Sequence, residues 1–193
     1  SGHPFTLYRA TIRGFAKKNL ADIKPADHKQ WVGGFVTGVR TIMGRRGKMA
    51  IVIVEDETQK LEVVVAGSSY EQHQHLLKTD QVLLFECKVA RDEYNGGGGV
   101  RINSDGIYDF DGARSAFARS LCLTMTPNTD VVKLSALLGS SRGQGYVGLK
   151  VSYEHPEVSA ELKPKSPWQI GIDSALLKQL GELLGQDAVE VVW

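Results

Sequence analysis

The middle of the chain alternates between short apolar runs and polar breaks. Five runs rich in β-branched and aromatic residues cover residues 31–41, 49–54, 60–66, 81–90 and 100–110. Runs of this length and composition, bounded by turn-forming residues, predict β-strands. Glycines at positions 33, 34 and 38 interrupt the first run and predict bends in that strand. Residues 69–77 predict a short helix between the third and fourth strands.

The order of these elements is strand, strand, strand, helix, strand, strand. This is the order of the OB-fold, a Greek-key barrel of five strands. Closure of the barrel removes exposed strand edges. We therefore predict an all-β OB-fold five-stranded Greek-key barrel over residues 31–110, followed by a small α+β domain. The residues expected in the sheet core are Val52, Val54, Leu61, Val63, Val65, Leu83 and Phe85.

Residues 1–30 predict a lead-in segment that contains a short helix. Pro4 can open a helix because the missing N–H of proline needs no partner in the first turn. We expect this helix to run to about Asn19, with Leu7, Phe15 and Leu20 as its inward contacts.

Residues 111–193 mix helical and strand patterns and predict the α+β domain. Strands are expected at 120–125, 145–153 and 188–193, and a helix over 130–138 that ends at Gly139. A second helix should begin after Asp173, which can cap it, and end at Gly185. Its apolar stripe consists of Leu176, Leu177, Leu180, Leu183 and Leu184.

Composition restricts the choice of partner only weakly. Hydrophobic residues make up 42% of the chain and the formal net charge is +1, so the chain can bury a core but has no strong overall field. Residues 1–30 hold six basic and two acidic side chains, residues 31–110 hold nine and eleven, and residues 111–193 hold eight and nine. Any site for an anion must therefore be a local cluster.

Cysteine usage and the chain ends indicate a cytoplasmic fragment. Cys87 and Cys122 lie in apolar runs, as expected of buried thiols in a reducing compartment. No apolar stretch approaches the roughly 20 residues that span a bilayer, and no signal peptide opens the chain. The start at Ser1 lacks a methionine, so we expect a piece of a longer protein.

Several of these segments resemble one family. Residues 31–40, 45–49, 54–58 and 61–65 are similar to the OB domain of the alpha subunit of bacterial DNA polymerase III. Ser1–Pro4 resembles the segment that leads into that domain, and Trp168–Trp193 resembles the final domain, which in the family contributes to binding the clamp-loader subunit tau. The resemblance covers the whole chain. It implies the C-terminal region of a DNA-directed DNA polymerase, a nucleotidyltransferase whose catalytic residues lie outside this chain.

The best candidate for DNA binding is the loop between the first two strands. Arg40, Arg45, Arg46 and Lys48 lie at the end of the first strand and in this loop, and no acidic residue occurs between Arg40 and Val54. OB-folds bind oligonucleotides across strands two and three with the help of this loop and the loop between strands four and five. Basic side chains there would neutralise phosphates. The alternative is a solvated hairpin tip, where basic residues are common.

The loop between strands four and five supplies a second group of candidates. Tyr94 could stack on a base, and Arg91 and Arg101 flank it in sequence. The alternative is a tyrosine that packs on the end of the barrel. The nearby Asp92 and Glu93 weaken the electrostatic argument.

The resemblance places a partner site in the final domain, with Trp168, Val191 and Trp193 as candidates. Tryptophan is enriched among interface hot spots, and a chain end frays unless it is held. The alternative is that the last strand completes the sheet of its own domain.

Other polar groups carry little chemistry. Glu55, Asp56 and Glu57 are adjacent, so they cannot easily converge on one ion, and they suit a turn. His73 and His75 do not share a helix face. We therefore expect no catalytic site, metal or cofactor in this chain.

The function that combines these observations is binding of single-stranded template DNA by the barrel and docking of tau by the final domain. The alternative is a protein-interaction module whose barrel never contacts DNA. An OB-fold nuclease would need a convergent site of carboxylates and arginine, which the sequence does not assemble.

Overall fold

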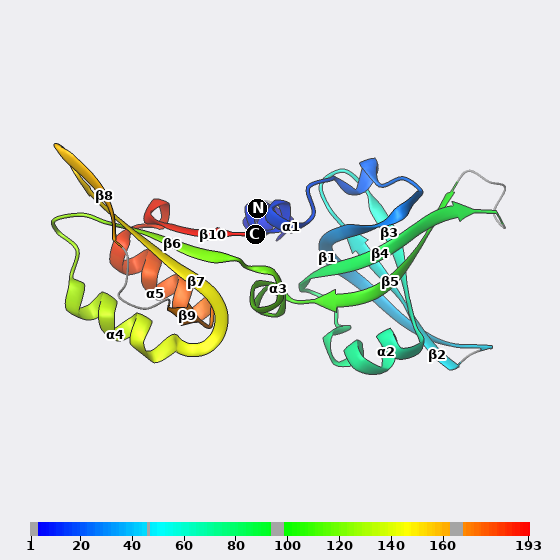
Figure 1. Ribbon diagram of the computed structural model, residues 1–193. Helices are drawn as coiled ribbons and strands as arrows, with labels where there is room; N and C mark the ends of the chain where they lie inside the picture. The colour runs from blue at the N-terminus through cyan, green and yellow to red at the C-terminus, as the bar shows by residue number, and fades with distance from the viewer. Residues whose placement is uncertain (1–3, 46, 94–98, 163–167) are drawn as a thin grey trace. The chain divides into compact units, whose positions relative to one another are not determined.

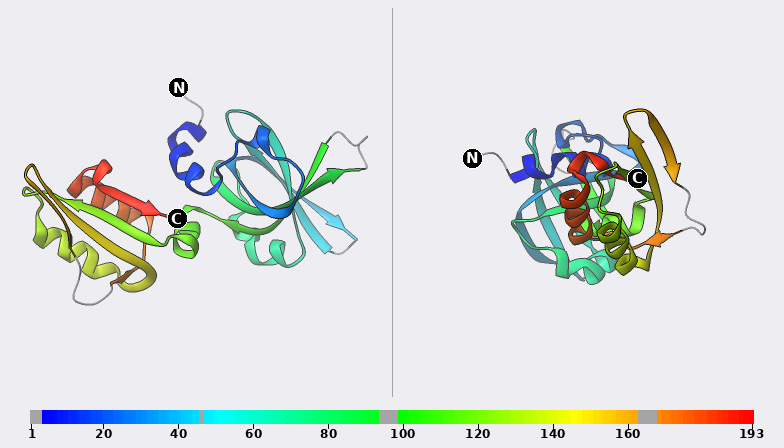
Figure 2. Two further views of the ribbon diagram at one scale, coloured as in Figure 1. Left: turned by 45° about the horizontal axis from the view of Figure 1, so that its top comes forward. Right: turned by 90° about the vertical axis from the view of Figure 1, so that its left-hand side faces the viewer.

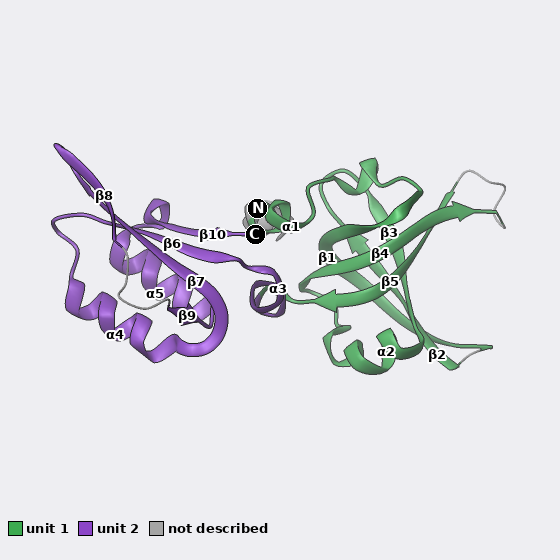
Figure 3. Cartoon of the chain, viewed as in Figure 1, with its two compact units in different colours: residues 1–110 green, residues 111–193 purple. Residues whose placement is uncertain are grey.

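The computed structural model describes residues 4–45, 47–93, 99–162 and 168–193, with no side-chain detail for residues 4–8 and 10. The chain divides into two compact units, unit 1 at residues 1–110 and unit 2 at residues 111–193 (Figure 3). Each unit has its own hydrophobic core. The two are described separately below.

Unit 1 is a closed barrel of five strands (Figure 1). The strands are β1 (Ala26–Gly44), β2 (Gly47–Glu55), β3 (Lys60–Ala66), β4 (Val82–Asp92) and β5 (Gly99–Tyr108). Their order around the barrel is β1-β2-β3-β5-β4, and only the β3–β5 pair is parallel. Helix α2 (Gly67–His73) and the 3-10 turn η2 (Gln74–Leu76) connect β3 to β4. This arrangement is the predicted OB-fold barrel.

Alternation along the strands fills the interior of the barrel. All seven core positions expected from the sequence are buried: Val52, Val54, Leu61, Val63, Val65, Leu83 and Phe85. Ile102 and Ile107 of β5 join the same cluster. Because side chains of successive residues point to opposite faces, the residues between them face outward.

Strand β1 is long and pairs with two neighbours. Its first half pairs with β4 and its second half with β2, and Phe35 has a partner in each. A register shift between Val36 and Gly38 bends the strand, as the glycines predicted. Before the bend, a Cβ atom at Gly34 would lie 2.8 Å from the carbonyl oxygen of Glu55, so β1 needs a residue without a side chain where it approaches the end of β2.

Helix α1 (Pro4–Phe15) covers part of the outside of the barrel. Ile12 and Ala16 are buried, and a Cβ at Gly33 would lie 2.8 Å from the Cγ2 of Ile12. The helix ends at Phe15 rather than at about Asn19. The 3-10 turn η1 (Leu20–Asp22) follows, and Leu20 is buried in the core of the barrel.

The buried carboxylate of Asp56 holds this lead-in segment. It accepts hydrogen bonds from the backbone N–H of Leu20 (2.9 Å), Thr58 (2.7 Å) and Gln59 (2.9 Å), and from the Thr58 hydroxyl (2.6 Å). The Arg13 guanidinium lies 3.6 Å away. Burial, the largest single influence, raises the pKa of Asp56, but the hydrogen bonds together outweigh it and the pKa lies below its usual value.

Unit 2 is a mixed sheet with two helices on one face (Figure 1). Its strands are β6 (Ser120–Met125), β7 (Arg142–His155), β8 (Val158–Leu162), β9 (Gln169–Ile170) and β10 (Val189–Val192), and its helices are α4 (Val131–Ser141) and α5 (Ser174–Leu184), with the turn η3 (Gln186–Ala188). The path β10-β6-β7-β8 is hydrogen-bonded in that order, and β9 pairs with β7.

The predicted capping residues of the unit 2 helices can be compared with the observed helix ends. Asp173 caps α5 by accepting from the N–H of Leu176 (2.7 Å), and Gly185 ends it at φ +96°. Asp130 caps α4 by accepting from Lys133 N–H (3.0 Å), but the prediction that Gly139 ends this helix is wrong. Gly139 lies within α4 without a positive φ, and the helix continues to Ser141 before the extended Arg142.

Helix α3 (Phe110–Phe117) spans the boundary between the units and was not predicted. Within unit 2, Asp111 fastens it to the start of α5. Its carboxylate accepts from the Ser174 N–H (2.9 Å), the Ser174 hydroxyl (2.8 Å) and Arg114 (3.0 Å). Strand β8 was missed as well, because all five of its residues are exposed and leave no alternating pattern.

We predict that Asp56→Asn lowers the free energy of unfolding of unit 1 by about 3 kcal/mol at pH 7, because an amide replaces the acceptor of four hydrogen bonds. A carboxyl whose pKa is lowered on folding stabilises the fold above its unfolded pKa of about 3.9 and loses this as the pH falls through the folded value. The difference between wild type and variant should therefore shrink below about pH 4.

Urea unfolding between pH 7 and pH 3 measures this difference. Asp27→Asn, at an exposed position of β1, is the control with the same change of charge. Equal stability of Asp56→Asn and wild type at pH 7 would contradict the role given to Asp56.

Candidate nucleic-acid interface

The outward side chains of β1, β2 and β3 form one continuous face. Register pairs Arg40 with Ile51 and Ile51 with Val64, and it pairs Ile53 with Glu62. The aliphatic members Ile51, Ile53 and Val64 are half-buried. This face is therefore an aliphatic surface with charged groups on it. We call it the β2–β3 face.

Beyond this face β1 and β2 continue as a two-stranded hairpin arm, defined here as residues 41–49. Figures 1 and 2 show it extending past the body of the barrel. Pairing continues from Thr41–Ala50 to Gly44–Gly47. Gly47 has φ +109°, a left-handed value that suits glycine. The β4–β5 hairpin extends from the same end of the barrel.

Three of the predicted cations lie on the β2–β3 face or on the hairpin arm beyond it. Arg40 lies on the β2–β3 face, and Arg45 and Lys48 are exposed on the hairpin arm. Arg46 lies outside the described residues. Arginine and lysine side chains at these positions have the chemistry required to neutralise phosphates.

Glu62, an acidic residue that was not predicted as part of the site, lies next to Arg40. Glu62 Oε1 is 3.5 Å from Nη2 of Arg40, and both side chains are more than half exposed. Strand register also brings Arg101 near Glu62, since the next residues, Val63 and Ile102, are paired. The signal was available in the alternation of β3, where Glu62 occupies an outward position between Leu61 and Val63.

The β4–β5 hairpin supplies the second group of cations. Arg91 and Arg101 are both exposed, and they lie on adjacent strands, where Arg91 pairs with Val100 and Arg101 with Ala90. Tyr94 lies outside the described residues. Arg101 on β5 thus lies near Glu62, the ion-pair partner of Arg40. The neighbouring Arg91 lies on β4.

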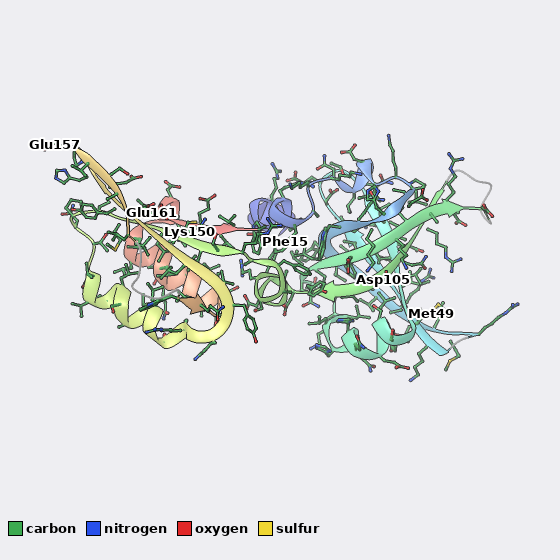
Figure 4. All side chains as sticks on the ribbon, viewed as in Figure 1. Phe15, Met49, Asp105, Lys150, Glu157 and Glu161 are labelled. Carbon is green, nitrogen blue, oxygen red and sulfur yellow. The ribbon has the colours of Figure 1, made fainter. Side chains whose placement is uncertain are left out.

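Three lysines elsewhere on the barrel, Lys29, Lys60 and Lys88, form ion pairs with acidic side chains. Lys29 lies 3.4 Å from Glu86 and 3.5 Å from Asp105, and Lys88 lies 3.5 Å from Asp105. Asp105 is labelled on β5 in Figure 4. The hydrogen bond and charge of Glu86 raise the pKa of Lys29. Arg45 and Lys48 on the hairpin arm are therefore better placed to meet an anion than Lys29 or Lys88.

Aromatic side chains gather away from the β2–β3 face. The ring of Trp31 lies 6.2 Å from that of Phe15 and 5.8 Å from that of Tyr108, under helix α1. In the described part of the β2–β3 face the outward residues are aliphatic or charged. Base stacking on an aromatic ring would have to come from Tyr94 or from outside this face.

The predicted partner residues occupy two places in unit 2. Trp168 is half-buried, its carbonyl oxygen accepts from Leu149 N–H of β7 (3.2 Å), and the Arg142 guanidinium lies 4.6 Å from its ring. Val191 belongs to β10, which pairs with β6 at the edge of the sheet. Strand β6 thus separates β10 from β7, the strand to which Trp168 is hydrogen-bonded.

The last strand also closes its own domain. Val189 and Val191 pack on the core that contains Leu176 and Leu180 of α5. Trp193 is half-buried at its end. Both sequence interpretations of the strand therefore stay open, because an edge strand can complete a sheet and still present its outer edge.

The remaining candidates for chemistry are structural. Asp56 is the buried anchor described above, and His73 Nδ1 lies 2.9 Å from the Ser69 carbonyl oxygen. Cys87 is a free thiol whose pKa burial raises. Across the described ranges, no group of three histidine, cysteine or acidic side chains is placed to hold a metal ion. None of the described helices has the length and apolar character needed to cross a membrane.

The barrel order, the helix between β3 and β4 and the open β2–β3 face define an OB-fold domain. Residues 30–109 match the family described as OB-fold nucleic acid binding domain. The predicted fold class is confirmed.

The whole chain is similar to the alpha subunit of DNA polymerase III. It is 40% identical over 195 residues to the subunit from Neisseria meningitidis serogroup A, 29% over 194 residues to that from Pseudomonas fluorescens, and 25% over 198 residues to that from Escherichia coli K12. These matches cover 98–100% of this chain and 16–17% of each relative. The chain thus spans about one sixth of the length of the curated relatives, and the predicted resemblance is confirmed.

Solved structures align with weaker overlap. The second OB-fold domain of replication protein A from Methanococcus maripaludis has a TM-score of 0.37 and 11% identity, covering 48% of this chain and 92% of that domain. A replication protein A heterotrimer bound to ssDNA has a TM-score of 0.38 and 13% identity, covering 70% of this chain and 31% of the matched chain.

Proposed function

We propose that the barrel binds single-stranded DNA with little sequence preference, through the hairpin arm and the β2–β3 face. The observation that carries this proposal is the position of Arg45 and Lys48 on an arm next to the face that OB-folds use for oligonucleotides. The contacts are mainly to phosphates, which carry no sequence information directly.

Binding should be weak because the site is only partly basic. Glu62 stands between Arg40 and Arg101, and residues 31–110 hold more acidic than basic side chains. An exposed ion pair contributes only about 0–1 kcal/mol, so Arg40 can leave Glu62 for a phosphate at little cost. The uncompensated carboxylate then repels the same phosphate.

We further propose that the parent protein is a DNA-directed DNA polymerase of the cytoplasm and that this segment holds its template strand. The chain would serve as a tail for binding DNA and other subunits of the polymerase, with catalysis located elsewhere in the parent. Free Cys87 and Cys122 suit a reducing compartment.

Unit 2 is proposed to dock the clamp-loader subunit tau. Support comes from the resemblance of Trp168–Trp193 to the final domain of the alpha subunit, and from β10 at the edge of its sheet. An edge strand offers backbone groups for pairing with another chain. Trp193 would add a side-chain contact at the end of that edge, while the Val191 side chain packs on the core of unit 2.

The rival function is a protein-interaction module whose barrel does not contact DNA. The acidic Glu62 on the β2–β3 face favours it. DNA binding and its dependence on salt distinguish the two functions, since a pure protein module would show no counterion release.

We expect the slope of log K against log salt to be near −2 for single-stranded DNA, from about three phosphates at about −0.7 each. Arg45→Ala combined with Lys48→Ala should reduce the magnitude of this negative slope by about 1.4. Fluorescence anisotropy with labelled oligonucleotides of several sequences measures both.

Lys150→Ala combined with Lys178→Ala, both exposed in unit 2, is the control with the same charge change. A slope that stays the same in the arm variant would remove the hairpin arm from the site. Absence of binding by the wild type at low salt would favour the protein-interaction module.

Glu62→Gln should raise the affinity for single-stranded DNA about threefold at low salt, because a carboxylate about 7 Å from a phosphate repels it by roughly 0.6 kcal/mol in water. Titration of both proteins at about 20 mM and 200 mM salt tests this, since the gain should fade as salt screens the repulsion. Glu71→Gln on α2, exposed and away from the β2–β3 face, should leave affinity unchanged. A lower affinity of Glu62→Gln would contradict the assignment.

Trp193→Ala should weaken binding of the C-terminal part of tau at least tenfold if the end of β10 is an interface hot spot. Calorimetry measures the affinity, and thermal melting of the same sample reports whether unit 2 is folded. Val158→Ala, an exposed apolar residue on β8 at the other end of the sheet path, is the control. Wild-type affinity in a normally folded Trp193→Ala protein would exclude this residue and shift the proposed site to the surroundings of Trp168.

A further inference from the structure

The end of the hairpin arm is apolar as well as basic. Met43 is 73% exposed and Ile42 is 41% exposed. Met49, labelled in Figure 4, pairs with Ile42 in the register, and Lys48 pairs with Met43. Single exposed apolar residues are ordinary on a protein surface, but here two adjacent exposed ones lie beside the half-buried Met49 on one arm.

The two faces of the arm carry different side chains. Ile42 and Met49 continue the β2–β3 face, because they follow the outward positions of Arg40 and Ile51 in the register. Met43 lies on the opposite face together with Lys48. A side chain at Gly44 would collide with the Cε atom of Met49, so Met49 bends over the end of the arm and Met43 is left as its most exposed apolar group.

The charge of the arm identifies a ligand with negative groups. Arg45 lies in the turn and Lys48 on β2 just after it, and residues 41–54 contain no acidic residue. Apolar side chains set between cations match a single nucleic-acid strand, which presents phosphates and unstacked bases next to each other. Methionine suits such a contact because its flexible thioether packs favourably against aromatic rings.

We propose that Met43 contacts a base of bound single-stranded DNA while Arg45 and Lys48 hold the adjacent phosphates. The inference rests on the proposed function and adds a contact to the bases at a defined residue. It assigns Met43 to binding by apolar contact alone, without hydrogen bonds that would read the sequence. The contact is therefore compatible with weak sequence preference.

The test separates loss of a base contact from loss of a phosphate contact. Met43→Gln keeps the length and charge of the side chain but removes its apolar character, and Met43→Leu keeps the apolar character. Met43→Gln should lower the affinity for an oligonucleotide of about twelve residues about fivefold at every salt concentration, with an unchanged slope of log K against log salt. Met43→Leu should bind within about twofold of the wild type.

Oligonucleotides with abasic sites give the matching change in the ligand. Wild type should lose affinity when bases are removed and the backbone is kept, and Met43→Gln should lose less, because the contact is already absent. Val132→Gln, on α4 with 80% of its side chain exposed, is the control for removing an exposed apolar group.

The outcomes distinguish this inference from the function on which it rests. Wild-type binding with a salt slope near −2, together with equal affinities of wild type and Met43→Gln, would overturn the base contact and leave DNA binding intact. Absence of wild-type binding at low salt would remove the proposed function itself. A flatter salt slope in Met43→Gln would also overturn the inference, since it would mean that the substitution disturbs the phosphate contacts.

Discussion

The buried carboxylate of Asp56 is the interaction on which the arrangement of unit 1 depends. It ties the turn between β2 and β3 to the start of η1 through the Leu20 N–H, with Arg13 of α1 close by. The lead-in segment therefore packs on one side of the barrel, over Gly33 and Trp31. The β2–β3 face and the hairpin arm stay uncovered by α1, so the anchor decides which surface of the barrel can receive a ligand.

Charge is distributed so that this uncovered surface differs from the rest of the barrel. Lys29 and Lys88 form ion pairs with acidic residues, and Arg40 forms one with Glu62. The two cations on the arm stand beside apolar side chains instead. A chain with a net charge of only +1 can thus have an anion site, because local geometry outweighs the overall balance at distances within a Debye length of about 10 Å.

The barrel could be predicted because period-two patterns specify both strands and their buried faces. The core valines of β2 and β3 are the clearest case. Other features depend on contacts that no local pattern reveals. The local sequence indicates only that Asp56 is a turn residue. Its role as an anchor depends on the hydrogen bond from the N–H of Leu20, 36 positions away. Glu62 was missed because a cation on β1 and an acid on β3 meet only across the sheet, and β8 because none of its residues is buried.

The division of β1 between two neighbours also determines how the barrel can open. The first half of the strand exchanges hydrogen bonds with β4 and the second half with β2, and the register shift at Val36 and Gly38 lies between them. The arm can therefore separate from its last pairs without breaking the β1–β4 ladder. Amide protons near Thr41 and Met43 should exchange with solvent through local fraying, whereas those near Val32 should exchange only through global unfolding. The hairpin arm is thus expected to open as a local unit of its own, attached to a barrel whose amide protons exchange slowly.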